Sequence, residues 1–243
     1  MTLKHWHRTN RSELNELLPE AIVILPIGAT EQHGPHLATG TDWMLAEAVT
    51  HQAANLIHDR AQRPLVLAPA LPYGASDHHL PFGGTLSLTP ETLLAVLRDL
   101  TRSLAASGGR RLLLVNGHGG NIGVCHAAAA AAASRYDVNV AHVDYWRLAR
   151  DTGDTPLPGH AGTFETALML AQDEGLVAER HPRPDPPSTP AIDDVQLHTA
   201  ESWRRIDGYT DHPERADAET GRAWFDQLAT ALGDRILELA EAL

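Results

Sequence analysis

The fold is decided by the apolar run Ala21-Ile22-Val23-Ile24-Leu25-Pro26-Ile27 and by the polar stretch Glu31-Gln32-His33-Gly34-Pro35-His36 that follows it. A run without alternation of apolar and polar residues is typical of a central parallel strand that is covered on both faces. Helical spacing of apolar residues begins near Thr41, so the polar side chains should lie just past the end of a strand, facing a cleft. The sequence here predicts a strand, a polar loop and a helix, in that order.

The same order recurs along the chain. A short helix at 12–18, with Ser12 as its N-cap, precedes the first strand. Further strands are predicted at 65–68, 111–115 and 138–143, and helices at 41–59, 90–108, 122–135, 162–174 and 217–242. Alternation of this kind predicts the α/β class, as a three-layer α/β/α sandwich with a mostly parallel central sheet. The segment 181–190 contains five prolines and is expected to be irregular.

Length and composition indicate one globular domain that spans 1–243. A chain of 243 residues and 26.3 kDa suits one sizeable α/β domain and shows no linker between two smaller ones. Hydrophobic residues make up 43% and charged residues 21%, which is ordinary for a globular protein and unlike a disordered chain. We therefore expect a substantial buried core.

The charge and the N-terminus exclude several classes of partner. The formal net charge of -12 argues against a nucleic-acid partner, because phosphate binding needs a basic surface. The single cysteine, Cys125, allows no internal disulfide framework and fits a reducing compartment. The N-terminus lacks the apolar core of a signal peptide, and no later run approaches ~18 apolar residues. We expect a soluble, cytoplasmic protein without a membrane partner.

Polar clusters follow several predicted strands or open the next helix. In a parallel sheet, ligands bind outside the carboxyl ends of the strands, where such loops converge. Carboxylates and imidazoles are the groups that hold divalent metals such as zinc, manganese and iron. The set offers three carboxylates and two imidazoles, enough for two divalent metals if Asp42 bridges them. The candidate metal ligands are Glu31, His33, Asp42, His118 and Glu165.

Each of these residues also has a plain structural interpretation. Glu31 and Asp42 could be helix caps or surface carboxylates. His118, between two glycines, could belong to a phosphate cradle at a helix N-terminus. His160 and Glu165 could form a loop contact and a helix-dipole partner. Their joint occurrence at one sheet edge favours the metal site over these separate explanations.

Such a site supports hydrolysis, because bound metals polarise a carbonyl and lower the pKa of water. The candidate catalytic residues are His160 and Glu165, and His160, which is not needed as a ligand, is the candidate acid or base. A serine nucleophile is disfavoured because no Gly-x-Ser-x-Gly motif is present. The candidate substrate-binding residues lie in the loops beside the ligands: Ser76, His79, Gly119 and Gly120.

Three blocks of the sequence resemble the signature blocks of the creatininase (creatinine amidohydrolase) family. They are residues 25–36 with Asp42, then Asn116-Gly117-His118-Gly119-Gly120-Asn121, then His160-Ala161-Gly162 with Glu165. The resemblance covers roughly residues 21 to 170 and is most specific in the first block. It implies an α/β/α fold, a homohexamer and a two-metal centre that uses zinc, manganese or iron. The implied reaction is hydrolysis of carbon–nitrogen bonds other than ordinary peptide bonds.

The resemblance also implies how the ligands are shared. Glu31, Asp42 and His118 would bind one metal, and His33, Asp42 and a further carboxylate the other. Creatininase itself takes that carboxylate from a Glu two residues after the histidine that matches His118, but this chain has Gly120 there. We hypothesise that Glu165 supplies the missing ligand.

The substrate stays open between several kinds of molecule. The departure at Gly120 weakens the case for creatinine and leaves a small cyclic amide, a formamide or a short peptide. The blocks around Tyr73-Gly74-Ala75-Ser76 and Phe82-Gly83-Gly84-Thr85 look somewhat closer to the mycofactocin-type precursor peptide peptidase. An alternative from another class is a non-catalytic protein of the same fold that binds a metal or a metabolite.

Overall fold

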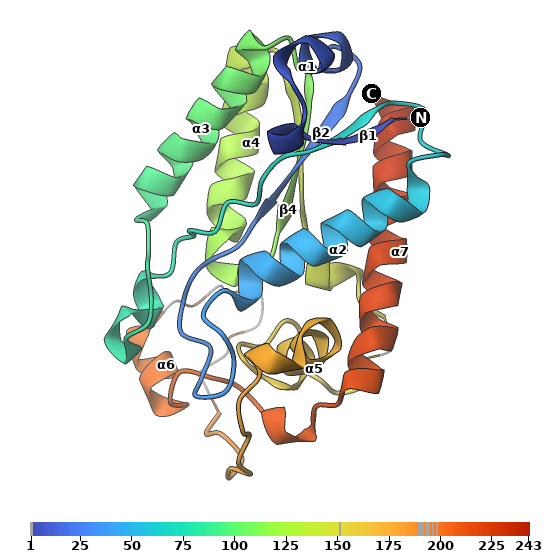
Figure 1. Cartoon of the computed structure of the whole chain (residues 1–243). Coiled ribbons are helices and arrows are strands. Elements are labelled where there is room, and N and C mark those ends of the chain that lie inside the picture. The colour runs from blue at the N-terminus through green and yellow to red at the C-terminus, as the bar shows by residue number, and fades with distance from the viewer. Residues whose placement is uncertain (1, 151, 189–191, 193–194, 196, 198) are drawn as a thin grey trace.

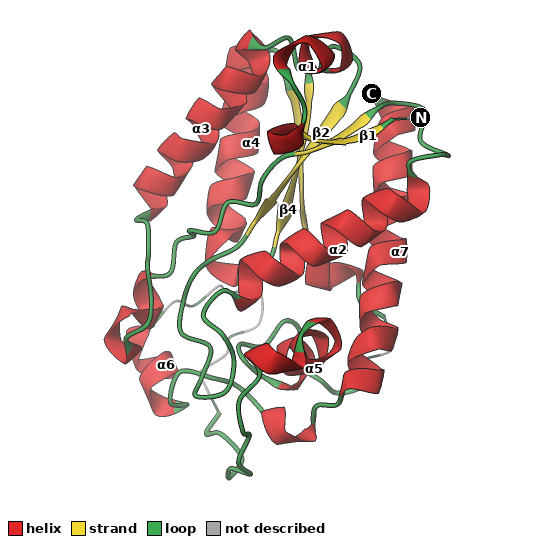
Figure 2. Cartoon of the chain, in the orientation of Figure 1, coloured by secondary structure: helices red, strands yellow, loops and turns green. Residues whose placement is uncertain are grey.

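The computed structural model of the chain describes residues 2–150, 152–188, 192, 195, 197 and 199–243. Its centre is a five-stranded sheet with the strand order β1-β3-β2-β4-β5. Figure 2 shows the strands in the interior of the molecule, with helices around them. Every pairing between these strands is parallel, which confirms the predicted α/β class. The strands are β1 (Leu3–His5), β2 (Ile22–Ile27), β3 (Leu65–Leu67), β4 (Arg111–Asn116) and β5 (Asn139–Asp144).

Helices cover both faces of the sheet (Figure 1). One face carries α1 (Arg11–Leu17), α3 (Pro90–Ala106) and α4 (Ile122–Tyr136), and the other carries α2 (Thr41–Ile57), α5 (Thr163–Gln172) and α7 (Ala218–Ala242). The short helix α6 (Ala200–Arg205) packs against the 3-10 helix at Asp77–Phe82. None of the described helices is both long and apolar enough to cross a membrane.

Strand β2 lies between β3 and β4 and separates two hydrophobic cores. Ile22 and Ile24 point into the core formed with α2, α5 and α7, whereas Val23 and Leu25 point into the core formed with α1, α3 and α4. All six residues of the strand are buried. Both faces of β2 therefore need apolar side chains, which explains the uninterrupted run in the sequence.

Several local predictions differ from the structure. The predicted cap Ser12 is wrong, because the side chain of Asn10 accepts the backbone N–H groups of Ser12 and Glu13 at the start of α1. Strand β1 was not predicted, since three residues at a sheet edge carry no readable periodicity. Residues 181–188 contain no helix or strand, as expected, while 189–190 of that predicted irregular segment lie outside the described residues.

Two glycines bring the first turn of α2 against the ends of β2 and β4. The last paired residues of these strands, Ile27 and Asn116, are followed directly by Gly28 and Gly117. A Cβ atom at Gly28 would lie 2.3 Å from the backbone nitrogen of Trp43, and one at Gly117 would lie 2.4 Å from the carbonyl oxygen of Asp42. The absence of side chains at both positions allows Asp42 to enter the sheet edge.

The substitution Gly117→Ala should destabilise the protein by about 1–3 kcal/mol, because the added methyl group overlaps the α2 backbone. Urea denaturation measures the free energy of unfolding. Gly123→Ala is the matched control: a Cβ atom there meets nothing within 4 Å, and Ala in place of Gly in a helix stabilises by roughly 0.5–1 kcal/mol. Equal stability of Gly117→Ala and the wild type would contradict the close approach.

Candidate metal centre

The five predicted ligands come together at the carboxyl ends of β2 and β4. Two belong to the loop after β2, one opens α2, one follows β4 and one lies in the first turn of α5. All five side chains are buried, although each is ionisable: Glu31, His33, Asp42, His118 and Glu165. Buried charged groups need compensating partners, so their contacts decide what the site can hold.

Asp42 lies between two histidines. Its Oδ1 is 3.1 Å from Nε2 of His33, and its Oδ2 is 3.0 Å from Nδ1 of His118. Although burial opposes it, these two imidazoles hold the pKa of Asp42 below its usual range. The two oxygens of one ionised carboxylate thus face two different imidazole nitrogens.

The ligand atoms form two groups that share Asp42. In the first group, Nδ1 of His118 lies 3.3 Å from Oε1 of Glu31 and 3.0 Å from Oδ2 of Asp42. In the second, Nε2 of His33 lies 3.1 Å from Oδ1 of Asp42 and 3.7 Å from Oε2 of Glu165. Ligands about 2.1 Å from a tetrahedral zinc are about 3.4 Å apart. Both groups have spacings of this size.

The far nitrogen of each histidine contacts a backbone carbonyl. Nδ1 of His33 lies 3.1 Å from the carbonyl oxygen of Glu31, and Nε2 of His118 lies 3.1 Å from that of Ala75. A ring nitrogen that donates to a carbonyl leaves the other nitrogen with a lone pair, here directed at the carboxylates. Neither oxygen of Glu31, nor Oδ2 of Asp42, has a hydrogen-bond partner among the described residues. This donor set fits a divalent cation.

The pKa values of His33 and Glu165 are both raised, as expected where buried carboxylates outnumber the imidazoles. Although burial lowers it, the Asp42 carboxylate raises the pKa of His33 to about 10. Burial raises the pKa of Glu165 to about 7, against the opposing effect of His33. Three carboxylates around two imidazoles attract positive charge, which protons or a metal cation can supply.

Position 120 cannot carry a ligand in this arrangement. A Cβ atom at Gly120 would lie 2.3 Å from the carbonyl oxygen of Ala75 and 2.4 Å from Nε2 of His118. Gly119 and Gly120 are both exposed, so their backbone forms a rim beside the buried His118. The carboxylate near His33 comes instead from Glu165, whose Oε2 also accepts the backbone N–H of Ala161 at 2.6 Å.

The predicted acid or base, His160, lies beside the first group of ligand atoms. Its Nδ1 is 3.4 Å from Oε1 of Glu31, and its Nε2 is 2.8 Å from the carbonyl oxygen of Gln32. Burial lowers the pKa of His160 well below the ordinary value. The imidazole is therefore neutral near pH 7, with a lone pair on one of its two nitrogens.

The predicted substrate-binding residues Ser76 and His79 lie on the same side of the site. Oγ of Ser76 is 3.2 Å from Nε2 of His118, and Nε2 of His79 is 3.6 Å from Oε1 of Glu31. The ring of His79 stacks on that of His160, with the centroids 4.1 Å apart. Both residues thus contact the site, while His36 from the first block points away and contacts Thr166.

Two aromatic neighbours were missed by sequence reasoning. The His78 ring is parallel to that of His118 at a centroid distance of 5.7 Å, and the Trp203 ring meets that of His79 edge-on at 4.6 Å. His78 was detectable, because it adjoins a candidate residue in a polar loop. Trp203 belongs to α6, which follows the proline-rich segment, and no local pattern connects it with the site.

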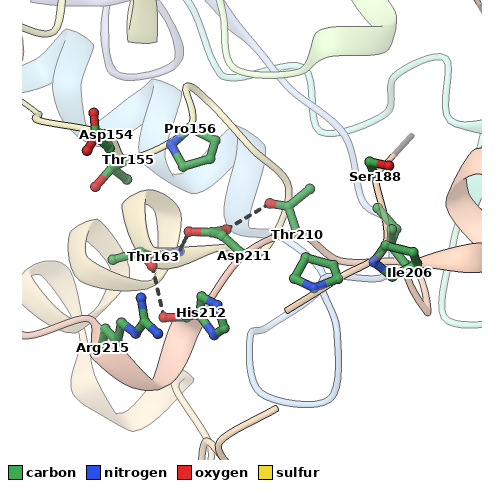
Figure 3. Close-up of a pocket in the computed structure, with 12 residues that line it drawn as sticks. Asp154, Thr155, Pro156, Thr163, Ser188, Ile206, Thr210, Asp211, His212 and Arg215 are labelled. Atoms are coloured by element: carbon green, nitrogen blue, oxygen red, sulfur yellow. Dashed lines mark hydrogen bonds between the residues drawn. The ribbon is translucent and has the colours of Figure 1, made fainter. Parts of the chain in front are cut away.

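Thr210, Asp211 and Thr163 are joined by hydrogen bonds (Figure 3). The Thr210 hydroxyl accepts the backbone N–H of His160 and donates to Asp211, whose other oxygen accepts the N–H of Thr163 at the start of α5. Thr163, Thr210 and Asp211 line a pocket of about 630 Å³, and none of the five candidate ligands lines it. Asp211 therefore fixes the turn that carries Glu165, a role the sequence did not reveal.

Asp211 caps α5 by accepting the backbone N–H of Thr163, so its replacement should affect both the stability of the protein and metal binding. Asp211→Ala should destabilise the protein by about 1 kcal/mol, the usual effect of losing a helix-capping carboxylate, and should also lower metal binding. Asp217→Ala is the matched control, because Asp217 caps α7 by accepting the N–H of Thr220. The control should lose similar stability and keep its metal. Equal metal contents in the two variants would count against the supporting role of Asp211.

The chain is similar in sequence to several hydrolases. The chain is 40% identical to a mycofactocin precursor peptide peptidase of Mycobacterium tuberculosis over 157 residues, which are 61% of the chain and 57% of that relative. It is 32% identical over 242 residues to the peptidase of the same name from Mycolicibacterium smegmatis, covering 92% of the chain and 87% of the relative. A creatinine amidohydrolase of Pseudomonas putida is 30% identical over 243 residues, covering 90% of each chain.

Solved structures of creatininases have the same fold. A structure described as "Creatininase Mn" superposes with a TM-score of 0.81 at 27% identity, covering 96% of this chain and 97% of that one. A mutant creatininase of the "Zn-Zn type" gives a TM-score of 0.80 at 26% identity, with the same coverage. The model of the family described as creatininase, creatinine amidohydrolase, matches residues 7–236. The chain belongs to the creatininase family of hydrolases.

Proposed function

We propose that this protein is a metal-dependent amidohydrolase that cleaves a carbon–nitrogen bond of a small molecule at a site with two metals. The observation that carries the proposal is the placement of Asp42, whose two carboxylate oxygens face His33 and His118 separately. A carboxylate in this position can bridge two cations. The substrate class is a small cyclic amide, a formamide or a short peptide.

Each metal would be bound by one imidazole, by one carboxylate that contacts only that metal, and by one oxygen of Asp42. Glu31 and His118 complete the first site, and His33 and Glu165 complete the second. Zinc is the proposed metal, with manganese or iron as alternatives, because mixed carboxylate and imidazole ligands suit all three. The creatininase structures of the Mn and Zn-Zn types support this choice.

Two metals bound by these residues would polarise the scissile carbonyl and would lower the pKa of water towards neutrality. The residues of this chain would position the substrate and move the proton. Nδ1 of His160 faces the site and can accept a proton from the attacking water and pass it to the leaving nitrogen. Ser76 and His79 would orient the substrate, and the backbone of Gly119 and Gly120 would contact it at the exposed rim.

A second candidate function is that of a peptidase acting on a short precursor peptide. It is favoured by the 40% identity over 157 residues to the mycofactocin precursor peptide peptidase of Mycobacterium tuberculosis. Over nearly the whole chain, the identity is 32% to the peptidase of Mycolicibacterium smegmatis and 30% to the creatinine amidohydrolase. Gly120 weakens the case for creatinine as the substrate, because a side chain at this position would overlap Ala75 and His118. Both candidates use the same site and differ in the substrate.

A substrate panel separates these functions. The purified protein is incubated with cyclic amides including creatinine, with formamides and with peptides that differ in their C-terminal residues, before and after chelation. The proposal predicts turnover of one class, loss on chelation and recovery when zinc or manganese is restored. Bound metal with no turnover of any class would favour a non-catalytic binding protein.

Metal contents of ligand variants test how the ligands are shared. Asp42→Ala should lose both metals, whereas His33→Ala and Glu165→Gln should each keep one, as measured by inductively coupled plasma mass spectrometry. His58→Ala, at the end of α2, is the control and should keep two. Two metals in the Asp42 variant, or full occupancy in Glu165→Gln, would contradict the assignment.

A further inference from the structure

Gln32 lies between two candidate ligands in the sequence and is buried, but its amide is not a metal ligand of the proposed site. Its Oε1 accepts the backbone N–H of Gly34 at 2.9 Å, and its Nε2 donates to the carbonyl oxygen of Gly208 at 2.7 Å. Rotating the amide by half a turn would oppose donor to donor and acceptor to acceptor. These two backbone contacts therefore fix which end of the amide is the nitrogen.

The fixed amide nitrogen also determines where His79 carries its proton. Nε2 of Gln32 lies 2.8 Å from Nδ1 of His79. An amide nitrogen can only donate, so Nδ1 of His79 accepts and the proton of the neutral ring is on Nε2. That N–H edge is directed into the site, with Nε2 at 3.6 Å from Oε1 of Glu31.

The backbone of the same residue determines the state of His160. Nε2 of His160 lies 2.8 Å from the carbonyl oxygen of Gln32, which can only accept, and 3.1 Å from the amide nitrogen of Gln32, which can only donate. The two hydrogens of that amide are used by the shorter contacts to Gly208 and His79, at 2.7 and 2.8 Å, so the carbonyl decides the state of His160. The proton of His160 is therefore on Nε2, and its Nδ1 presents a lone pair 3.4 Å from the same Oε1 of Glu31. Two stacked rings thus face one carboxylate oxygen with opposite hydrogen-bonding character.

We propose that Gln32 is a positioning residue that makes His160 a proton acceptor and His79 a hydrogen-bond donor in the same site. The inference rests on the proposed hydrolysis and deepens it. In the reaction, water forms the new C–O bond and gives one proton to Nδ1 of His160, which passes it to the nitrogen as the C–N bond breaks. His79 keeps its proton and donates a hydrogen bond to the substrate.

This assignment separates His79 from the metal ligands. Glu31, His79 and His160 each offer an atom within 4.8 Å of the others, a spacing that could hold an ion. The nitrogen that His79 directs there carries a hydrogen, however, and a metal ligand must offer a lone pair. Moving that proton to Nδ1 would oppose it to the Gln32 amide nitrogen, so the hydrogen-bond network disfavours His79 as a ligand.

Neutron diffraction from crystals of the zinc-loaded protein, exchanged into heavy water, observes the protons directly. The expected nuclear density places deuterium on Nε2 of His79 and of His160, and two deuterium atoms on Nε2 of Gln32. Deuterium on Nδ1 of His79 or on Nδ1 of His160 would overturn the proposal. This measurement needs no turnover, so its failure is distinguishable from failure of the proposed reaction.

Kinetics test whether the arrangement matters for catalysis. Gln32→Leu removes the amide that orients His79 and keeps the backbone carbonyl that orients His160, so it should lower kcat by about 10²-fold, the size of losing one hydrogen-bond donor to the transition state, with a much smaller change in KM and an unchanged zinc content. Gln52→Leu is the matched control, because the Gln52 amide donates to Asp226 on an exposed surface. The control should have wild-type kcat and KM.

A double variant distinguishes positioning from simple structural support. If Gln32 acts through His79, the pair Gln32→Leu with His79→Leu should be little slower than His79→Leu alone. The proposal would be overturned if the loss of kcat in the double variant equalled the product of the two single losses. An effect of Gln32→Leu on KM alone would overturn it as well. If thermal unfolding shows that the Gln32→Leu variant is not folded, the neutron map of the wild-type protein decides the question by itself.

Discussion

The structure depends on the burial of three carboxylates, Glu31, Asp42 and Glu165, at the carboxyl edge of a parallel sheet. Burying one unpaired carboxylate is strongly unfavourable, and three close together repel one another as well. Two imidazoles lie among them, with their far nitrogens at backbone carbonyls. The oxygens of Glu31 still have no hydrogen-bond partner within the described part of the chain. The site is built for positive charge that the side chains do not supply in full.

The topology explains how these groups reach one place. Strand β2 has β3 on one side and β4 on the other, so the chain leaves β2 at the point where the strand order reverses. The loops after β2 and β4 therefore open side by side. Gly28 and Gly117 admit the first turn of α2 there, and Asp211 holds the first turn of α5. Packing of small residues and helix capping thus set the spacing of the ligands.

Much of this arrangement could be predicted from the sequence, for definite physical reasons. The apolar run of β2 and the helical periodicity of α2 and α7 are strong local signals, and a parallel sheet forces polar loops to meet at one edge. Local signals do not extend to contacts between distant segments. Trp203, Asp211 and the partners of Gln32 come from parts of the chain that only the tertiary structure brings to the site. The N-cap of α1 is Asn10 and not the predicted Ser12. The sequence did not distinguish the two, because both residue types are good N-caps.

We propose that Asp42 is shared by two cations and that Glu165 completes the second site. Anomalous diffraction from crystals of the full chain loaded with manganese or zinc tests it most directly, because the peaks locate each ion independently of the protein atoms. Two peaks are expected about 3.5–4 Å apart, one on each side of Asp42, with Glu165 in contact with the ion nearest His33. A single peak, or a second ion that Glu165 does not contact, would contradict it.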